Sequence, residues 1–152
     1  MDDANQLNKK IELSEQYCQK KGERLTKKRK LVLRILLTSP KAISAYELVD
    51  DCKNNHGEII SAVTVYRALE FLQTQGFAHR LELANKYVAC SHMVCRHQHK
   101  PSQFLICNQC SRVEEVDVDV SMLKGLREVT NKTGFHLSDT PLELSGVCKK
   151  CI

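Results

Sequence analysis

Residues 61–76 read SAVTVYRALEFLQTQG, and residues 77–90 continue as FAHRLELANKYVAC. The first stretch has apolar residues at the three- and four-residue spacing of a helix, with Ser61 as its N-cap and a glycine at its end. The second contains two short extended segments around a turn at residues 84–85. A helix followed directly by a hairpin is typical of the second half of a winged helix-turn-helix, and this stretch therefore predicts that fold.

Three further helices are predicted upstream of this stretch. Residues 3–22 form an amphipathic segment, and Thr26 is a suitable N-cap for a second helix that ends at residues 39–40. Residues 44–47, Ser-Ala-Tyr-Glu, form a capping-box pattern that opens a third helix. The helices from Thr26 onward complete the winged helix, and the first helix is an N-terminal extension.

The pattern changes after a polar, histidine-rich loop at residues 91–103. Residues 104–107 form a short apolar strand, and valines interleaved with acids between residues 113 and 120 indicate a half-buried strand. A helix is predicted at residues 121–133 and a last strand at 135–144. The second half is therefore predicted to be a small α/β domain, and the whole chain an α+β protein.

Two Cys-x-x-Cys pairs lie in this second half, Cys107 with Cys110 and Cys148 with Cys151. A pair on a tight turn points both thiolates the same way, and two pairs supply the ligands of a closed tetrahedral zinc site. A redox motif would need a thioredoxin-like context, which the pattern lacks. A disulfide scaffold is disfavoured because we expect no secretory signal, and 152 residues bury a core without disulfides. The spacing therefore predicts a structural zinc site.

Positive charge is concentrated in one segment of the chain. Residues 20–34, KKGERLTKKRKLVLR, hold eight basic residues and one acid, which suits contact with a phosphate backbone. The alternative is a solvated, lysine-rich helix face. The candidate phosphate contacts are Arg24, Lys27, Lys28 and Arg29. No stretch approaches the ~18 apolar residues of a membrane-spanning helix, so we expect no membrane partner. Because the chain is rich in cysteine and we expect no signal peptide, we also expect a reducing, cytoplasmic location.

The helix that opens at Ser61 is the predicted recognition helix. In a helix-turn-helix, the second helix enters the major groove with its N-terminal residues at the base edges. Arg67 could donate two hydrogen bonds to guanine, Thr64 could hold a phosphate, and the Tyr66 ring could contact a thymine methyl group. Tyr46, at the start of the preceding helix, could also touch the duplex. For either tyrosine, half-buried packing is the alternative.

The chain resembles the ferric uptake regulator family in segments that read RLTKKRKLVLRIL, ISAYELVD, TVYRALEFLQTQGFAHRLE, ICNQC with VEEV, and GVCKKC. The similarity covers about residues 7–152 and is strongest to the zinc uptake regulator branch. It implies a homodimeric, metal-dependent transcriptional repressor of zinc-uptake genes. Such a repressor binds palindromic double-stranded operator DNA and has no small-molecule substrate. Tyr46, Tyr66 and Arg67 match the family's DNA-contacting positions, and the cysteine quartet matches its structural zinc site.

Three regions with separate roles follow from this reading. Residues 1–84 are predicted to be the winged-helix DNA-binding domain, and residues 85–103 a hinge and metal-sensing loop. Residues 104–152 are predicted to be a zinc-stapled dimerisation domain.

A second, exchangeable metal site is expected at the hinge, because four thiolates hold zinc too firmly for a sensor. The resemblance implies a His, a Cys, a second His and a Glu as regulatory ligands. His79, Cys90 and Glu115 match three of these positions, and we choose His99 as the second histidine. His97 is the reserve for His99, and Cys95 could compete with them. A thiolate at Cys90 favours zinc over iron(II), so two zinc ions per chain are expected.

Three alternatives remain open at this point. The first is an iron- or peroxide-responsive regulator of the same family, against which Cys90 argues. The second is a zinc- or thiol-dependent enzyme. The closed quartet leaves no open metal position for it, and the sequence has no HExxH motif, nucleophile elbow or phosphate loop. The third is a further metal site near His136 and Asp139, where many relatives carry a histidine at the second position.

Overall fold

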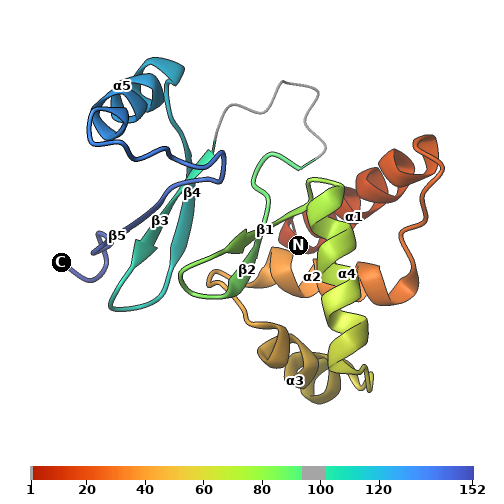
Figure 1. Cartoon of the computed structure of the whole chain (residues 1–152). Coiled ribbons are helices and arrows are strands. Elements are labelled where there is room, and N and C mark those ends of the chain that lie inside the picture. The colour runs from red at the N-terminus through yellow and green to blue at the C-terminus, as the bar shows by residue number, and fades with distance from the viewer. Residues whose placement is uncertain (1, 94–101) are drawn as a thin grey trace. The chain divides into compact units, whose positions relative to one another are not determined.

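The structure is a computed structural model that describes residues 2–93 and 102–152. It divides into two compact units, residues 1–96 and 97–152, each of which is described here by itself. The first contains α1 (Asp2–Lys20), α2 (Lys27–Thr38), α3 (Ala45–His56), α4 (Ala62–Thr74), β1 (Ala78–Leu81) and β2 (Lys86–Ala89) (Figure 1). The second contains β3 (Ser102–Cys107), β4 (Val113–Asp117), α5 (Val120–Asn131) and β5 (Glu143–Gly146). None of the described helices has the length and apolar character needed to span a bilayer.

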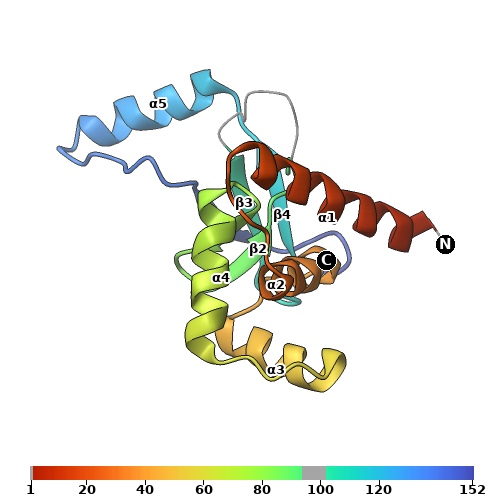
Figure 2. The same ribbon diagram turned by 90° about the vertical axis from the view of Figure 1, so that its right-hand side faces the viewer.

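The core of the first unit lies where α4 packs against α2 and α3 (Figure 2). Leu33 on α2, Leu48 on α3 and Leu69 on α4 are all fully buried. Phe77, directly after α4, is also buried, and its ring meets that of Tyr17 edge-on with centroids 5.6 Å apart. Burial of these side chains supplies the main driving force for folding of the unit.

Side-chain caps begin the helices of the first unit where the sequence predicts. The hydroxyls of Thr26, Ser44 and Ser61 accept the backbone N–H groups three residues later, and Glu47 completes the capping box with Ser44. Gly57 ends α3 with a φ of +66°, a conformation that glycine adopts without strain. The short connection from Gly57 to Ser61 makes α3 and α4 a helix-turn-helix.

The predicted hairpin is confirmed, although its turn is longer than expected. β1 and β2 pair antiparallel from Ala78↔Ala89 to Leu81↔Lys86, so residues 82–85 form the turn. Ile43, before α3, exchanges two backbone hydrogen bonds with Tyr87, of 2.8 and 2.9 Å. This bridge fastens the wing to the helices, and the sequence did not indicate it because the partners are 44 residues apart.

The second unit is a three-stranded sheet in the order β4-β3-β5, with β3 antiparallel to β4 and parallel to β5. The predicted strand at residues 135–144 is wrong for most of its length, because only residues 143–146 pair. Pro141 lies just before that strand, where its missing N–H costs no ladder hydrogen bond. α5 confirms the predicted helix, and it exposes the apolar side chains of Val120, Met122 and Val129.

Candidate metal centres and DNA-contacting surface

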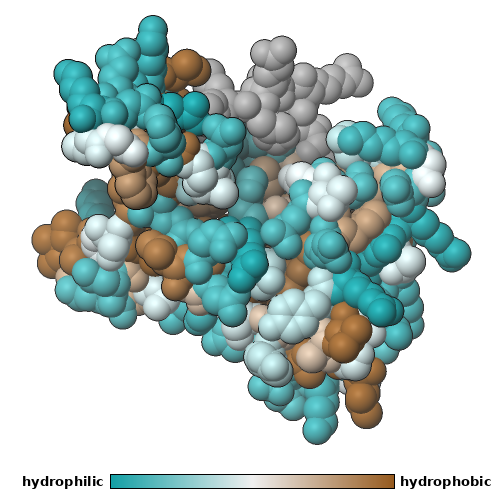
Figure 3. Space-filling view, viewed as in Figure 1, coloured by the Kyte–Doolittle hydropathy of each residue, from teal (hydrophilic) through white to brown (hydrophobic). Residues whose placement is uncertain are grey.

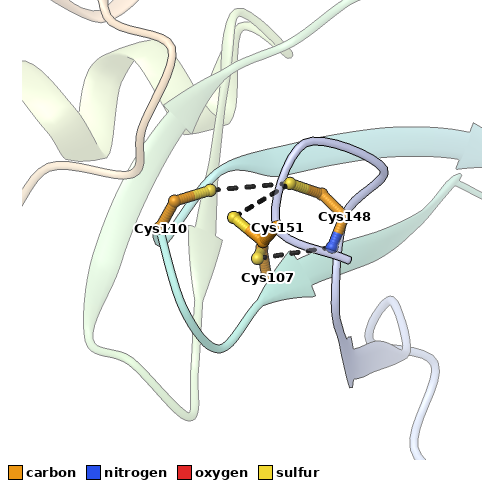
Figure 4. Close-up of side chains that lie close together, drawn as sticks. All are labelled: Cys107, Cys110, Cys148 and Cys151. Atoms are coloured by element: carbon orange, nitrogen blue, oxygen red, sulfur yellow. Dashed lines mark hydrogen bonds between the residues drawn. The ribbon is translucent and has the colours of Figure 1, made fainter.

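The four cysteines of the two Cys-x-x-Cys pairs meet at one end of the sheet in the second unit (Figure 4). Their Sγ atoms all lie within 4.8 Å of one another. The Sγ of Cys148 is 3.7 Å from that of Cys110 and 3.6 Å from that of Cys151, and the backbone N–H of Cys148 donates to the Sγ of Cys107 at 3.4 Å. Such a group can surround one metal ion on all sides.

Strand pairing brings the two cysteine pairs together. The parallel register of β3 and β5 places Cys107 opposite Gly146, and the N–H of Asn108 donates to the carbonyl of Gly146 at 2.9 Å. Each pair is closed by its own turn, with Ser111 N–H donating to Cys107 at 2.9 Å and Cys151 N–H donating to Cys148 at 2.8 Å. The two turns therefore lie side by side, although 37 residues of chain separate them.

The sulfur atoms of the quartet differ in acidity. Backbone hydrogen bonds, chiefly from Cys110 and then from Cys148, lower the pKa of Cys107 to about 6. Hydrogen bonds with the sulfurs of Cys148 and Cys110 raise the pKa of Cys151 to about 12. Four neighbouring thiols share protons in this way because adjacent thiolates repel one another. A divalent cation removes that repulsion, and four thiolates in a closed group are the ligand set that fits structural zinc.

Two of the predicted regulatory ligands belong to the wing of the first unit. His79 lies on β1 opposite Val88, and the N–H of Cys90, just after β2, donates to the carbonyl of Phe77 at 2.9 Å. His79 and Cys90 are thus diagonal neighbours on one face of the hairpin rather than directly opposite. Their ligand atoms lie within 4.8 Å of each other, so one ion could bind both.

The remaining predicted ligands do not belong to the wing. Glu115 lies on β4 of the second unit, where it pairs with Phe104 on β3. His99, the reserve His97 and the competing Cys95 all lie outside the described residues. Within the described residues, therefore, the structure gives positions for three of the four predicted ligands, each in its own unit.

His136 and Asp139 make other contacts among the described residues. The ring Nδ1 of His136 is 3.0 Å from the side-chain oxygen of Asn131, and Asp139 forms an ion pair of 2.8 Å with Arg127. Neither residue joins a group of potential ligands in the described parts of the chain. Nothing described there supports the further metal site that the sequence left open.

The predicted base-reading residues lie at the exposed start of α4 and of α3. Tyr66 and Arg67 are exposed on α4, and Tyr46 is exposed on the first turn of α3. Thr64 is half-buried, and its hydroxyl oxygen lies 2.9 Å from that of Ser61. The first three side chains are therefore accessible to a partner, whereas Thr64 also takes part in the helix cap.

The basic segment is less uniform than its sequence indicates. Arg24 and Lys28 are exposed, and Lys27 forms a solvent-exposed ion pair of 3.5 Å with Glu58. The guanidinium of Arg29 instead lies 3.7 Å from the ring centroid of Phe71 on α4 and donates to the carbonyl of Arg24 at 2.6 Å.

These contacts favour a structural role for Arg29 over the predicted phosphate contact. Sequence reasoning missed this role because Phe71 is 42 residues away along the chain. No local pattern pairs the two residues.

Known proteins resemble this chain along nearly its whole length. The family described as the ferric uptake regulator family matches residues 20–145. The zinc uptake regulation protein of Escherichia coli (strain K12) is 35% identical over 143 residues, which cover 91% of this chain and 79% of that protein.

Two solved structures are also similar. One is described as a zinc uptake regulator complexed with zinc and DNA. It has a TM-score of 0.79 and 34% identity, with 95% of this chain and 94% of that one covered. The other, holo XcZur, has a TM-score of 0.74 and 38% identity, with 93% of this chain and 95% of that one covered. The matched family, the identity to its members and the shared fold agree, and the chain belongs to the ferric uptake regulator family.

Proposed function

We propose that this chain represses zinc-uptake genes by binding operator DNA when zinc is available. The observation that carries the proposal is its similarity, at 34% identity, to a zinc uptake regulator bound to zinc and DNA. The chain is a zinc-responsive, DNA-binding transcriptional repressor of its family, zinc is its metal cofactor, and it is not an enzyme.

Two zinc ions per chain, with different roles, form the first part of the mechanism. The first would be held by Cys107, Cys110, Cys148 and Cys151, whose sulfurs lie within 4.8 Å of one another. A closed thiolate site exchanges its metal slowly, so this zinc would hold the second unit together at any zinc supply.

The second zinc would be the regulatory one. His79 and Cys90 on the wing offer an imidazole nitrogen and a thiolate within 4.8 Å of each other. Glu115 and a histidine, His99 or else His97, would complete a four-ligand site. The thiolate selects zinc over iron(II), and the mixed ligand set leaves the metal easier to lose than the quartet does.

Zinc at the regulatory site would act by linking the two units. His79 and Cys90 belong to the first unit and Glu115 to the second, so an ion bound by all three restricts their relative motion. In a dimer, this restriction would fix the two recognition helices one helical turn of DNA apart, about 34–36 Å. Without zinc, the two units would adopt many relative orientations. The free energy of selecting the one that fits DNA would then lower the affinity for the operator.

The domain roles follow from this scheme. Residues 1–84 would bind DNA, residues 85–103 would form the hinge and metal-sensing loop, and residues 104–152 would form a homodimer. Apolar side chains that reach the surface of the second unit, including those on α5 (Figure 3), suit burial against a second copy. A palindromic operator matches the two-fold symmetry of such a dimer. The repressor would act in the bacterial cytoplasm, where the chromosome lies.

The base contacts would come from Tyr46, Tyr66 and Arg67, and the phosphate contacts from Arg24, Lys27 and Lys28. Thr64 is half-buried beside the N-cap of α4, from which its hydroxyl could reach a phosphate.

Zinc content and operator binding, measured on the same preparations, test the proposal. The wild-type chain is expected to hold two zinc ions, and mild chelation is expected to remove one of them together with operator binding. Cys90→Ser is expected to keep the quartet zinc and to lose zinc-dependent binding, whereas Cys52→Ala, at a buried cysteine outside both sites, should change neither.

A Cys90→Ser variant that still binds its operator in response to zinc would contradict the assignment of the regulatory site. Titration with iron(II) and manganese(II) in place of zinc tests the alternative regulators. Stronger operator binding with either metal would overturn the zinc specificity.

A further inference from the structure

Two branched apolar side chains are exposed on either side of the N-cap of α4. Ile59 has 86% of its surface accessible and Val63 has 59%, whereas their neighbours Ile60 and Val65 are buried in the core. Branched aliphatic side chains of this kind stabilise the fold little when they are exposed. Their position beside the cap residue Ser61 places them at the end of the helix that enters DNA in this fold.

Val63 belongs to the same helix face as the predicted base-reading residues. It lies four residues before Arg67 and three before Tyr66, and side chains at these spacings are neighbours on a helix surface. Four residues advance a helix by about 6 Å, which is close to two base-pair steps of about 3.4 Å. If Arg67 reaches one base pair, Val63 faces a base pair one or two steps away.

The surroundings of Val63 suit DNA better than an apolar protein partner. The first turn of α4 contains no acidic residue, and the positive end of its helix dipole lies there. Arg67 adds positive charge one helical turn after Val63, and Glu58, the acid that directly precedes Ile59, pairs with Lys27. A negatively charged surface with an apolar group set into it is complementary to this arrangement.

We propose that Val63 is a specificity-determining residue that contacts the 5-methyl group of an operator thymine, one or two base pairs from the one that Arg67 reads. This inference rests on the proposed function and adds one base to what the recognition helix reads. The thymine methyl is the apolar group that a major groove presents at its base edges, and valine has no hydrogen-bonding side-chain atom with which to read anything else.

The test removes the side chain of Val63 and the 5-methyl group of the thymine, first separately and then together. An operator is first selected from random duplexes with the zinc-loaded full-length protein. Each thymine is then replaced by deoxyuridine, in both half-sites at once, and binding is measured for the wild type, Val63→Ala and Ile59→Ala. Since Val63 is largely exposed, its truncation leaves the core intact, and Leu13→Ala on α1 serves as an apolar truncation outside the helix-turn-helix.

The wild type is expected to lose about fourfold in affinity for each methyl contact removed, hence about fifteenfold for the symmetric pair. One of the thymine positions is expected to be the one that Val63 contacts. Val63→Ala should bind the all-thymine operator about as weakly as the wild type binds the operator with deoxyuridine at that position. The affinity of Val63→Ala should not change further when that thymine is replaced by deoxyuridine. The affinities of Ile59→Ala and Leu13→Ala should fall on the same replacement, as the wild-type affinity does.

Two results would overturn the inference while leaving the proposed function in place. One is a Val63→Ala variant that responds to every deoxyuridine replacement as the wild type does. The other is a uniform loss of affinity on all sequences, which would indicate a backbone contact. Failure to select any zinc-dependent operator would instead refute the proposed function itself.

Discussion

Truncation of Arg29 should lower the stability of the fold, whereas truncation of Lys28 should weaken operator binding, although the two residues are adjacent and carry the same charge. The guanidinium of Arg29 lies 3.7 Å from the ring centroid of Phe71 and donates to the carbonyl of Arg24, whereas Lys28 is exposed. A cation–π contact contributes about 0.5–2 kcal/mol and a net hydrogen bond about 0.5–1.5 kcal/mol. Because the donor is partly exposed, we expect Arg29→Ala to lower the free energy of unfolding by about 1–2 kcal/mol.

The two variants are compared by thermal unfolding and by the salt dependence of operator binding. For a unit of this size, each kcal/mol corresponds to about 4–8 °C in melting temperature, so we expect a decrease of about 4–16 °C for Arg29→Ala and none for Lys28→Ala. Lys28→Ala should keep its melting temperature. It should reduce the slope of log affinity against log salt by about 0.9 per protomer, or about 1.8 for a dimer.

Both variants remove one positive charge. A difference between them in melting temperature or in salt slope therefore comes from the different contacts of the two side chains and not from the net charge. An Arg29→Ala variant with unchanged melting temperature and a reduced salt slope would refute the structural role and restore the phosphate contact.

Three further predictions concern the cysteine quartet and a helix cap. Cys110→Ser should lower the zinc content by one ion per chain and destabilise the second unit, while Cys52→Ala keeps all its zinc; metal analysis after gel filtration distinguishes them. Zinc binding to the quartet at pH 7 should release fewer than four protons, because the pKa of Cys107 is about 6 and its thiol is already largely ionised. Because the pKa of Cys151 is about 12, zinc displaces a proton there at neutral pH, and zinc affinity should fall as the pH falls. The fall should become steeper below about pH 6, where protons also compete for the sulfur of Cys107, and a competing indicator dye can follow it. Ser44→Ala removes the capping box of α3 and should cost about 1 kcal/mol in urea unfolding; an unchanged midpoint would show that Glu47 caps the helix without it.

Local signals in the sequence predicted the elements of the first unit well. Thr26, Ser44 and Ser61 each accept the N–H predicted for a cap, because capping depends on residues within one turn of one another. The bridge from Ile43 to Tyr87 and the stacking of Arg29 on Phe71 were not predictable in this way. Both join segments that are distant in sequence, and no periodicity records them.

The second unit was harder to predict from its sequence. Its helix was recognised from the apolar spacing, but the last strand was placed too early. The apolar residues around Phe135 and Leu137 suggested a strand, yet only residues 143–146 find a partner in β3. Strand formation depends on a neighbouring edge with free backbone groups, which the sequence of one segment does not reveal.

The sequence by itself determined the kind of chemistry this protein performs. The spacing of Cys107 and Cys110, and of Cys148 and Cys151, specifies two thiolate pairs, because residues three apart on a tight turn point the same way. Only the tertiary structure decided that these pairs form one group. The parallel register of β3 and β5 brings the two turns together, with the four sulfurs within 4.8 Å. That register results from backbone pairing between segments that are distant in sequence. A local motif can therefore specify the ligands of a site, but it does not specify which ligand pairs come together.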